Sequence, residues 1–184
     1  AMSATTGQDG INIGLGISKI TIDRVLIHDN DGLAGTVADA GAIVIGGKDA
    51  ITATPGITIT ANSAALLPSH NFADIVIDTD AGVGNTSTGT GTAYLNIAAN
   101  VSGLNIGIGE VGVSGSNAVG TTVRRGNDAA NYNKILSGLT LTTGTMAATV
   151  QLGAAPQGAM IKLNTTMTGG LSIANLGIYD ASTV

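Results

Sequence analysis

The sequence predicts an all-β protein with a solenoid-like or layered β-architecture, with an antiparallel β-sandwich as the alternative. The first observation is a phrase that occurs four times, in which a glycine precedes an apolar, small-or-polar, apolar alternation. It begins at Gly14, Gly103, Gly138 and Gly170. Such alternation is the period of a β-strand with one buried face. We therefore expect each of these glycines to open a strand.

Composition is the second observation. The chain has no Trp, no Cys and one Phe, but 43% of its 184 residues are hydrophobic. This hydrophobic content argues against disorder, because disordered segments are poor in apolar residues. A core of Ile, Val, Leu and Ala packs well in thin layers, in which strands lie close together. Composition therefore favours layered sheets over an α/β core.

A slip in the apolar phase is the third observation. Ile17 is followed by Ile20 and Ile22, and the copy that begins at Gly170 has the same spacing. A slip of one residue turns side chains to the other face unless the chain bends or bulges there. The expected unit is thus a strand, a corner and a second strand. The four phrases start 89, 35 and 32 residues apart, and because a solenoid keeps a near-constant period, the sandwich alternative stays open.

Turn residues divide the chain into its expected elements. Ala64–Leu67 is expected to form at most one or two helical turns, because Pro68 would stop a helix. Loops rich in small and polar residues are expected at 33–41, 79–92 and 114–134. Strands are expected at 11–17, 20–27, 43–45, 57–60, 75–77, 94–99, 103–106, 135–141, 146–152, 160–163 and 171–178.

Length and charge limit the function classes. Residues 1–184 are expected to form a single β-rich domain, as all-β chains of this size commonly do. A net charge of −5 excludes a basic footprint for nucleic acid. No stretch approaches the roughly 20 apolar residues of a membrane helix, so we expect no integral membrane span. Residues 1–80 sum to −6 and residues 81–184 to +1, which suits either head-to-tail association or a solvated acidic face.

Two acidic turns are weak candidates for calcium. Asp29 and Asp31, and then Asp78 and Asp80, place carboxylates two residues apart beside a glycine, as oxygen-rich calcium loops do. Neither pair has the full register of a calcium loop, and turn chemistry alone explains both. We expect no cofactor, with calcium as the single low-ranking exception.

Residues suited to catalysis do not form a recognisable motif. Ser69, His70 and Asp74 supply the residue types of a triad, but no nucleophile elbow surrounds the serine. His28 and His70 are too few to hold zinc in a chain without Cys. We therefore expect no enzymatic activity, no catalytic residues and no metal centre beyond the calcium candidates.

Threonine-rich strands allow a second interpretation. The segments 57–60 and 139–143 alternate Thr with apolar residues, so each could present a row of hydroxyls on one face. An ice-binding or glycan-binding surface uses such a layout, although Thr is also favoured in strands because it is β-branched. A monomeric extracellular binding module for ice, glycan or calcium is therefore the alternative function.

Three stretches together resemble a known family: 6–11 (TGQDGI), 27–32 (IHDNDG) and 152–160 (LGAAPQGAM). They resemble stretches of secreted proteobacterial proteins of unknown function, some described as putative pilus-system or surface-filament proteins. The similarity spans most of the chain. The resemblance implies export, a β-rich fold and assembly outside the cell, with no catalytic residues. It also implies a natural chain that continues beyond Val184.

The leading hypothesis is a secreted structural subunit, located extracellularly or at the bacterial surface, that polymerises by pairing strand edges. Its expected products are an extracellular filament, a pilus-like fibre in a biofilm, or a surface layer. The partner is the chain itself, with a cell-surface anchor or neighbouring fibres as further contacts. Strands with few charges invite such pairing. The segment 1–17 and the C-terminal strand are the expected donors or acceptors, through Ile11, Ile13, Leu15, Ile17, Leu171, Ile173, Leu176 and Ile178.

Overall fold

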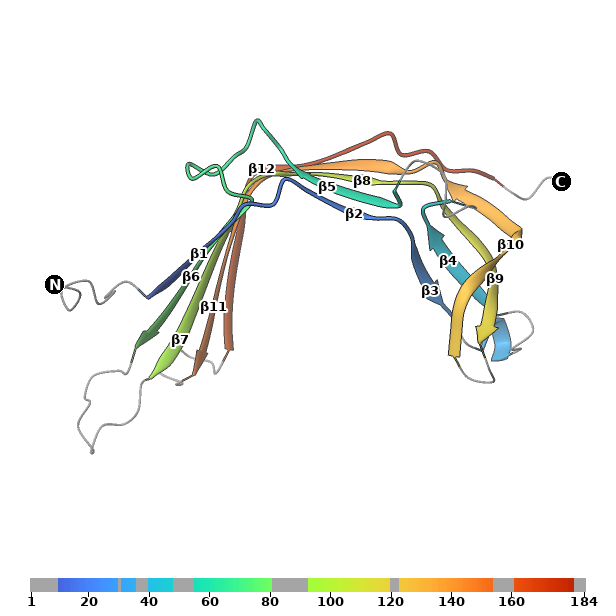
Figure 1. Cartoon of the computed structure of the whole chain (residues 1–184), viewed down its shortest axis with the longest axis horizontal. Coiled ribbons are helices and arrows are strands. Elements are labelled where there is room, and N and C mark those ends of the chain that lie inside the picture. The colour runs from blue at the N-terminus through green and yellow to red at the C-terminus, as the bar shows by residue number, and fades with distance from the viewer. Residues whose placement is uncertain are drawn as a thin grey trace. The chain divides into compact units, whose positions relative to one another are not determined.

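Strands make up most of the chain that the structure, a computed structural model, describes (Figure 1). The described residues are 10–29, 31–35, 40–47, 55–80, 93–119, 123–153 and 161–180. One 3₁₀ turn, η2 (Leu33–Gly35), is the only helical element among them. The all-β prediction is confirmed. The strands are β1 (Ile11–Leu15), β2 (Lys19–Ile22), β3 (Val25–His28), β4 (Gly41–Ile45), β5 (Ile57–Ala61), β6 (Ala73–Asp80), β7 (Tyr94–Val101), β8 (Leu104–Ile108), β9 (Val111–Val119), β10 (Val123–Leu136), β11 (Leu139–Gly153) and β12 (Ile161–Ala174).

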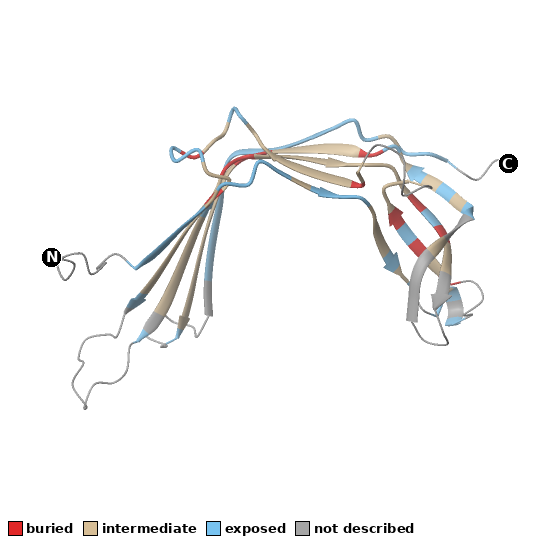
Figure 2. Cartoon of the chain, viewed as in Figure 1, coloured by how far each residue is buried: buried red, intermediate tan, exposed pale blue. Residues whose placement is uncertain are grey.

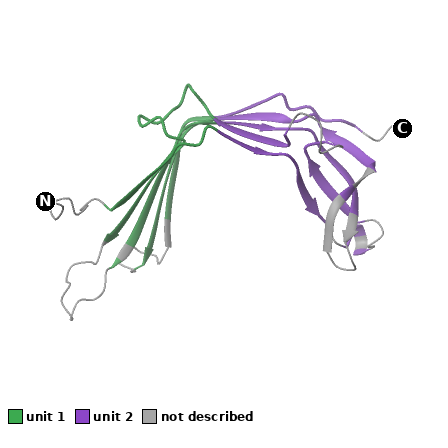
Figure 3. Cartoon of the chain, viewed as in Figure 1, with its two compact units in different colours: residues 1–18, 61–104, 143–170 green, residues 19–60, 105–142, 171–184 purple. Residues whose placement is uncertain are grey.

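The chain divides into two compact units, each built from three separate segments (Figure 3). Unit 1 comprises residues 1–18, 61–104 and 143–170, and unit 2 comprises residues 19–60, 105–142 and 171–184. Strands β11 and β12 each contribute to both units. Whether residues 1–184 fold as a single domain stays a prediction.

Unit 1 contains one antiparallel sheet. β1 pairs with β6, β6 with β7, and β7 with the 146–153 part of β11. β12 pairs with β11. These contacts join strands that are far apart in sequence, which is the pattern of an antiparallel layer rather than of successive solenoid coils. β1 and β12 therefore lie at the two ends of the strand order.

Unit 2 contains two sheets. The first follows the order β11, β8, β5, β2, in which β11 contributes residues 139–142. The second follows the order β10, β9, β4, β3, and its pairs are antiparallel. Strand β10 slips register against β9 at several points, as β-bulges do, so it bends along its length.

The repeated glycine phrase marks where strands change unit. β1 ends at Leu15 and β2 begins at Lys19, so the predicted break between two strands is confirmed, and the unit boundary follows Ser18. Gly103 and Gly138 each precede the first residue of a strand, as predicted. The other two copies differ, because Gly14 lies inside β1 and Gly170 inside β12.

Gly170 explains how a strand continues through the phrase. Gly169 and Gly170 have φ angles of 102° and 75°, a region that glycine enters without steric cost. β12 therefore runs on from residue 161 to residue 174. The prediction of separate strands at 160–163 and 171–178 was wrong in this respect; Ile178 forms only an isolated bridge to Leu136.

The prediction of a loop at 114–134 was also wrong, because β9 and β10 occupy most of this segment. Its polar side chains hid the strands, but several of them find partners within the sheet. Ser116 Oγ lies 2.7 Å from His28 Nδ1, and Arg24 donates to Asn127 Oδ1 at 2.8 Å. Satisfied polar groups can lie on the inner side of a sheet at little cost.

The remaining loop predictions have mixed outcomes. Thr79 and Asp80 belong to β6, and the rest of the predicted loop at 79–92, residues 81–92, lies outside the described residues. The expected helical stretch at 64–67 is a hydrogen-bonded turn, closed by the Ala65 amide on the Asn62 carbonyl at 3.0 Å.

The buried residues are few and small (Figure 2). In unit 2, they centre on β4 and β9, where Val44 is fully buried beside Ala42 and Ser114. In unit 1, the buried residues Leu67, Ala73 and Ser102 lie around the connection from β5 to β6. Most of the sheet in unit 1 is only half-buried.

Candidate functional site

Strand β1 and residues 161–170 of β12 form the two edges of the unit 1 sheet. The predicted C-terminal assembly residues, Leu171, Ile173, Leu176 and Ile178, belong to unit 2, and Leu176 and Ile178 lie beyond the end of β12. β1 pairs with β6 on one side, and among the described strands nothing pairs with its other side. β12 is in the same position relative to β11. An edge strand presents a row of unpaired backbone N–H and C=O groups, which is a template for pairing with another chain.

Side chains on both edges are unusually exposed for apolar residues. Ile11 is 61% exposed, and every residue of β12 whose side chain is described is also exposed. Leu15 is the exception among the predicted assembly residues, because it is half-buried. The exposed members of that set are Ile11, Ile13, Ile17, Leu171, Ile173, Leu176 and Ile178.

Edge β1 lacks the features that usually prevent pairing between chains. Its sequence, INIGL, contains no charged residue and no proline, whereas natural edges are often blunted by Lys, Pro or bulges. Two outer strands of unit 2 differ, because β2 begins with Lys19 and β10 is bulged. The third, β3 (VLIH), resembles β1 in having no Lys, acid or proline. β1 and β3 are therefore both weakly protected edges in the described part of the chain.

The unit 1 sheet has one apolar and one polar face. Directly opposed residues of antiparallel strands point to the same side, and the register places Ile13, Ile75, Ala99 and Ala148 in one row. The adjacent row, whose side chains point to the other side of the sheet, contains Asp74 and Asn100 instead. We call the first side the apolar face of unit 1: Ile11, Ile13, Leu15, Ala73, Ile75, Ile77, Thr79, Leu95, Ile97, Ala99, Val101, Met146, Ala148, Val150 and Leu152.

A threonine face forms on the first sheet of unit 2. Thr140 lies opposite Gly107, and a Cβ on Gly107 would lie 4.0 Å from Thr58. Thr142 donates its hydroxyl to Asn105 Oδ1 at 3.1 Å. The segments 57–60 and 139–143 are thus brought together. The register assigns to this face Lys19, Thr21, Thr58, Thr60, Asn105, Gly107, Thr140 and Thr142.

A hollow of about 310 Å³ lies at one end of the threonine face. Thr58 and Thr140 contribute to its lining, together with Ser137 and Asn175. Hydroxyl and amide groups can donate and accept hydrogen bonds, so the hollow suits a small polar group. Sequence reasoning identified the threonines but had no signal for Ser137 or Asn175.

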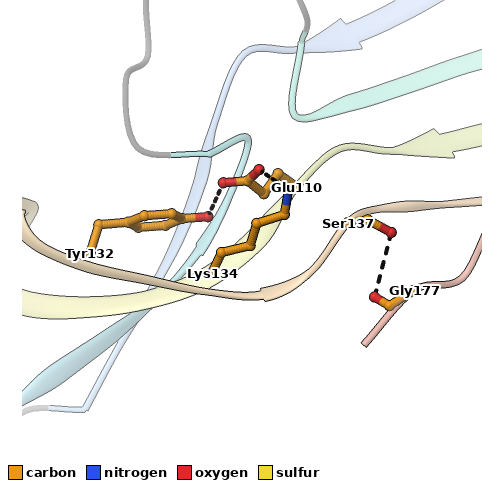
Figure 4. A network of polar contacts seen from close by, with 5 residues as sticks. All are labelled: Glu110, Tyr132, Lys134, Ser137 and Gly177. Carbon is orange, nitrogen blue, oxygen red and sulfur yellow. Dashed lines mark hydrogen bonds and ion pairs between the residues drawn. The ribbon is translucent and has the colours of Figure 1, made fainter. Parts of the chain in front are cut away.

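A polar network holds the C-terminal segment against β10 (Figure 4). Tyr132 donates to Glu110 Oε1 at 2.8 Å, and Lys134 Nζ lies 2.8 Å from Glu110 Oε2. The Lys134 ammonium also lies 4.3 Å from the ring centre of Tyr179. Near it, the Ser137 amide donates to the Gly177 carbonyl at 3.0 Å. This network is a structural clamp that the sequence did not reveal.

The network shifts the pKa of each of its ionisable members. Partial burial by itself raises the pKa of Glu110, but hydrogen bonds from Lys134 and Tyr132 outweigh it and leave the pKa lowered. The hydrogen bond with Glu110 raises the pKa of Lys134, and burial raises that of Tyr132. Glu110 and Lys134 are therefore both charged around neutral pH, which maintains the ion pair.

The calcium candidates do not converge. Asp29 and Asp31 are exposed, and Asp29 Oδ1 accepts the Asp31 amide at 3.3 Å, as in a simple Asx turn. Asp78 is half-buried beside Gly10, and the side chain of Asp80 lies outside the described residues. No cluster of three or more metal-binding side chains occurs among the residues that the structure describes. Calcium binding stays a prediction without a built site.

Ser69, His70 and Asp74 do not form a triad geometry. The Ser69 hydroxyl donates to Asp74 Oδ2 at 2.5 Å, and Asn71 donates to Asp74 Oδ1 at 2.7 Å. These bonds, that from Ser69 foremost, lower the pKa of Asp74. The serine thus contacts the carboxylate directly rather than through an imidazole, which is the arrangement of a turn stabilised by side chains.

Comparison of the chain with protein-family models, with curated proteins and with solved structures gave no match. The similarity to secreted proteobacterial proteins therefore stays a prediction. Among the described residues, no helix has the length and apolarity needed to cross a membrane.

Proposed function

We propose that this protein is a structural subunit that self-assembles, through pairing of strand edges, into an extracellular filament, a pilus-like fibre or a surface layer. One observation carries the proposal: the N-terminal strand β1 and the C-terminal strand β12 are opposite edges of one sheet. Both are exposed and open to another strand, and β1 is apolar apart from Asn12, whereas β12 mixes apolar with polar residues and includes Lys162.

Two different edges favour an open polymer. When β12 of one copy pairs with β1 of the next, each copy offers again the same two free edges, so growth does not stop at a dimer. Head-to-tail contacts of this kind give filaments when the rotation between copies does not close a ring. The main-chain hydrogen bonds supply the affinity, as in other cases of strand addition.

We also propose that the subunit is exported and acts at the cell surface. Charged residues are only 10% of the chain, against roughly 25% in average soluble domains, so few charges oppose strand pairing. The resemblance to secreted proteobacterial proteins points to the same location. In that setting, a cell-surface anchor and neighbouring fibres in a biofilm are the expected further contacts.

Electron microscopy with paired proline variants tests the proposal. Consecutive residues of a strand direct their N–H groups to opposite sides, so one of Thr165→Pro and Thr166→Pro removes an outward N–H of β12 and the other an inward one. The outward variant should keep the fold, because proline is tolerated at a free edge, and should lose filaments. The inward variant serves as the matched control, since it should lose stability first.

The wild-type chain should form filaments visible by negative stain. Wild-type protein that stays a lone particle at high concentration, or filaments that persist in both proline variants, would contradict edge pairing through β12. Deletion of residues 1–17 tests β1 in the same way. Normal filaments after this deletion would remove β1 as the partner edge.

The threonine face supports a second candidate function, a monomeric binding module for ice or glycan. Hydroxyls from Thr21, Thr58 and Thr140 share one face beside the hollow. Size-exclusion chromatography separates the candidates, because a module elutes near its mass of 18.0 kDa and a polymer in the void volume. Thr58→Val together with Thr140→Val should abolish ligand binding by such a module and leave filaments unchanged.

A further inference from the structure

We propose that the apolar face of unit 1 is a second interface, which pairs face to face with the same face of another copy. This contact is distinct from edge pairing and does not depend on it. It would stack two sheets around a two-fold axis with their apolar faces together. A filament would then contain two layers of sheet rather than one.

The first argument is that this face needs a cover. Sheets are stable when one face is packed against another layer, yet the residues of this face are half-buried or exposed, apart from Ala73. The reverse side of the same sheet carries Asp74, Asp78 and Asn100, which suit water. The two sides therefore differ as an interface and a solvated surface do.

The second argument, that the cover is another copy, comes from the sizes of the side chains. Across the sheet, the central row reads Ile13, Ile75, Ala99, Ala148, with the large residues in one half and the small ones in the other. A two-fold axis parallel to the strands, between β6 and β7, places β1 of one copy over β11 of the other. Ile13 then lies opposite Ala148, and Ile75 opposite Ala99. Self-complementarity of this kind is what an isologous interface requires.

The neighbouring row fits the same axis. Ile11, Ile77, Ile97 and Val150 follow one another across the sheet, so the rotation sets Ile11 over Val150 and Ile77 over Ile97. These residues are of similar size and fill the space on both sides of the central row. Aligned packing of two twisted sheets about 10 Å apart accommodates such layers.

The area of the face is sufficient. Three strands of about eight residues and the five-residue β1, spaced about 4.8 Å apart at about 3.3 Å per residue, give a face of roughly 460 Å². Two such faces bury roughly 900 Å² as flat areas, and the relief of the side chains brings the buried surface to about the 1,000 Å² that a specific interface should reach. The face also lacks charged residues, so a charged partner would leave its groups unpaired.

A double-mutant cycle between Ile13 and Ala148 tests this interface. Within one chain, two strands separate these residues, so they do not touch, whereas across the proposed axis they face each other. The dimer dissociation constant is measured by sedimentation equilibrium in the Thr165→Pro or Thr166→Pro background that stops filaments. We expect Ile13→Ala and Ala148→Ile each to weaken dimerisation about tenfold, and the double variant to return to within about threefold of the background.

The matched control is the cycle Asn12→Ala and Thr149→Val, at the equivalent positions on the polar face. It should leave the dissociation constant unchanged. A background protein that stays monomeric, or a dimer in which Ile13 and Ala148 are additive, would overturn the proposal. Circular dichroism confirms that each variant is folded. If Ile13→Ala or Ala148→Ile does not fold, the cycle is repeated with the milder substitutions Ile13→Val and Ala148→Val.

A crosslinking readout covers the case in which neither proline variant stops filaments. The chain has no Cys, so Ile13→Cys and Ala148→Cys chains can be mixed and joined by a short bismaleimide. A crosslinked pair is expected for these positions and not for Asn12→Cys with Thr149→Cys. Edge pairing alone would give equal yields at both pairs, which would reject the face contact without affecting the edge proposal.

Discussion

The two units handle their apolar residues differently. In unit 2, Val44 is fully buried, and polar pairs such as His28 with Ser116 form within the same region. Unit 2 also leaves an apolar row exposed at Ile27, Ile43 and Val113. In unit 1, one sheet carries a continuous apolar face that is mostly half-buried, and the fully buried side chain among the described residues is that of Ser102. The comparison teaches that the same Ile- and Ala-rich composition gives unit 2 a fully buried apolar centre and leaves the described part of unit 1 without one.

The largest expected effect breaks the internal core of unit 2. Val44→Asp places a charge where the side chain has no exposed surface, so we expect it to destabilise the protein by about 4 kcal/mol or more. Val113→Asp is the matched control, because Val113 lies on the neighbouring strand β9 and is 42% exposed. Thermal unfolding followed by circular dichroism measures both. Equal losses of stability would show that unit 2 has no distinct core.

A second prediction concerns close packing in unit 2. A Cβ added to Gly112 would clash with the ring of Tyr132, so Gly112→Ala should cost about 1–3 kcal/mol through overpacking. Gly107→Ala is the control, because its Cβ would have only ordinary contacts. Urea unfolding compares the two variants. A cost for Gly107→Ala as large as that for Gly112→Ala would contradict this account.

A smaller effect sharpens the comparison through the clamp. Glu110→Gln removes the charge that holds Lys134 but keeps an acceptor for Tyr132, so it should cost about 1 kcal/mol. Filaments should form as before, because the clamp contains no residue of β1 or β12. Loss of filaments in this variant, with the fold retained, would move the assembly site away from unit 1.

The smallest effect is the pH dependence of the same clamp. The pKa of Glu110 is lowered in the folded state, so its contribution is present above its ordinary value of 4.5 and is lost as the pH falls through the lower folded value. Between pH 6 and pH 3, this should lower the melting temperature by about 2–4 °C. Glu110→Gln should lose that part of the acid dependence. An unchanged acid dependence in the variant would assign it to other carboxylates.

Sequence reasoning predicted the local features of the fold. The phase slip after Ile17 correctly indicated a break between two strands, because a slip of one residue would otherwise turn the apolar side chains to the other face. The strands β9 and β10 escaped prediction, because their polar side chains, which bind residues outside these two strands such as His28 and Arg24, mask the alternation. The glycine rule failed at Gly170, where positive φ angles let the strand bend without ending.

The candidate surfaces depend on pairings that no short segment reveals. Sequence identified Ile11 and Ile173 as apolar and unguarded, but the opposite edges of one sheet follow only from which strands pair. The apolar face joins residues more than 130 positions apart, such as Ile13 and Ala148. The clamp at Glu110 likewise joins three distant segments, so its residues carried no local signal.

The central claim, that copies pair through β1 and β12, is tested most directly by hydrogen exchange with and without assembly. Amides of residues 11–15 and 161–174 should exchange slowly in wild-type filaments and quickly in the unassembled outward proline variant, because edge N–H groups find partners only in the polymer. Amides of β4 should be protected equally in both. If the amides of both edges exchange as quickly in wild-type filaments as in the unassembled variant, edge pairing is contradicted.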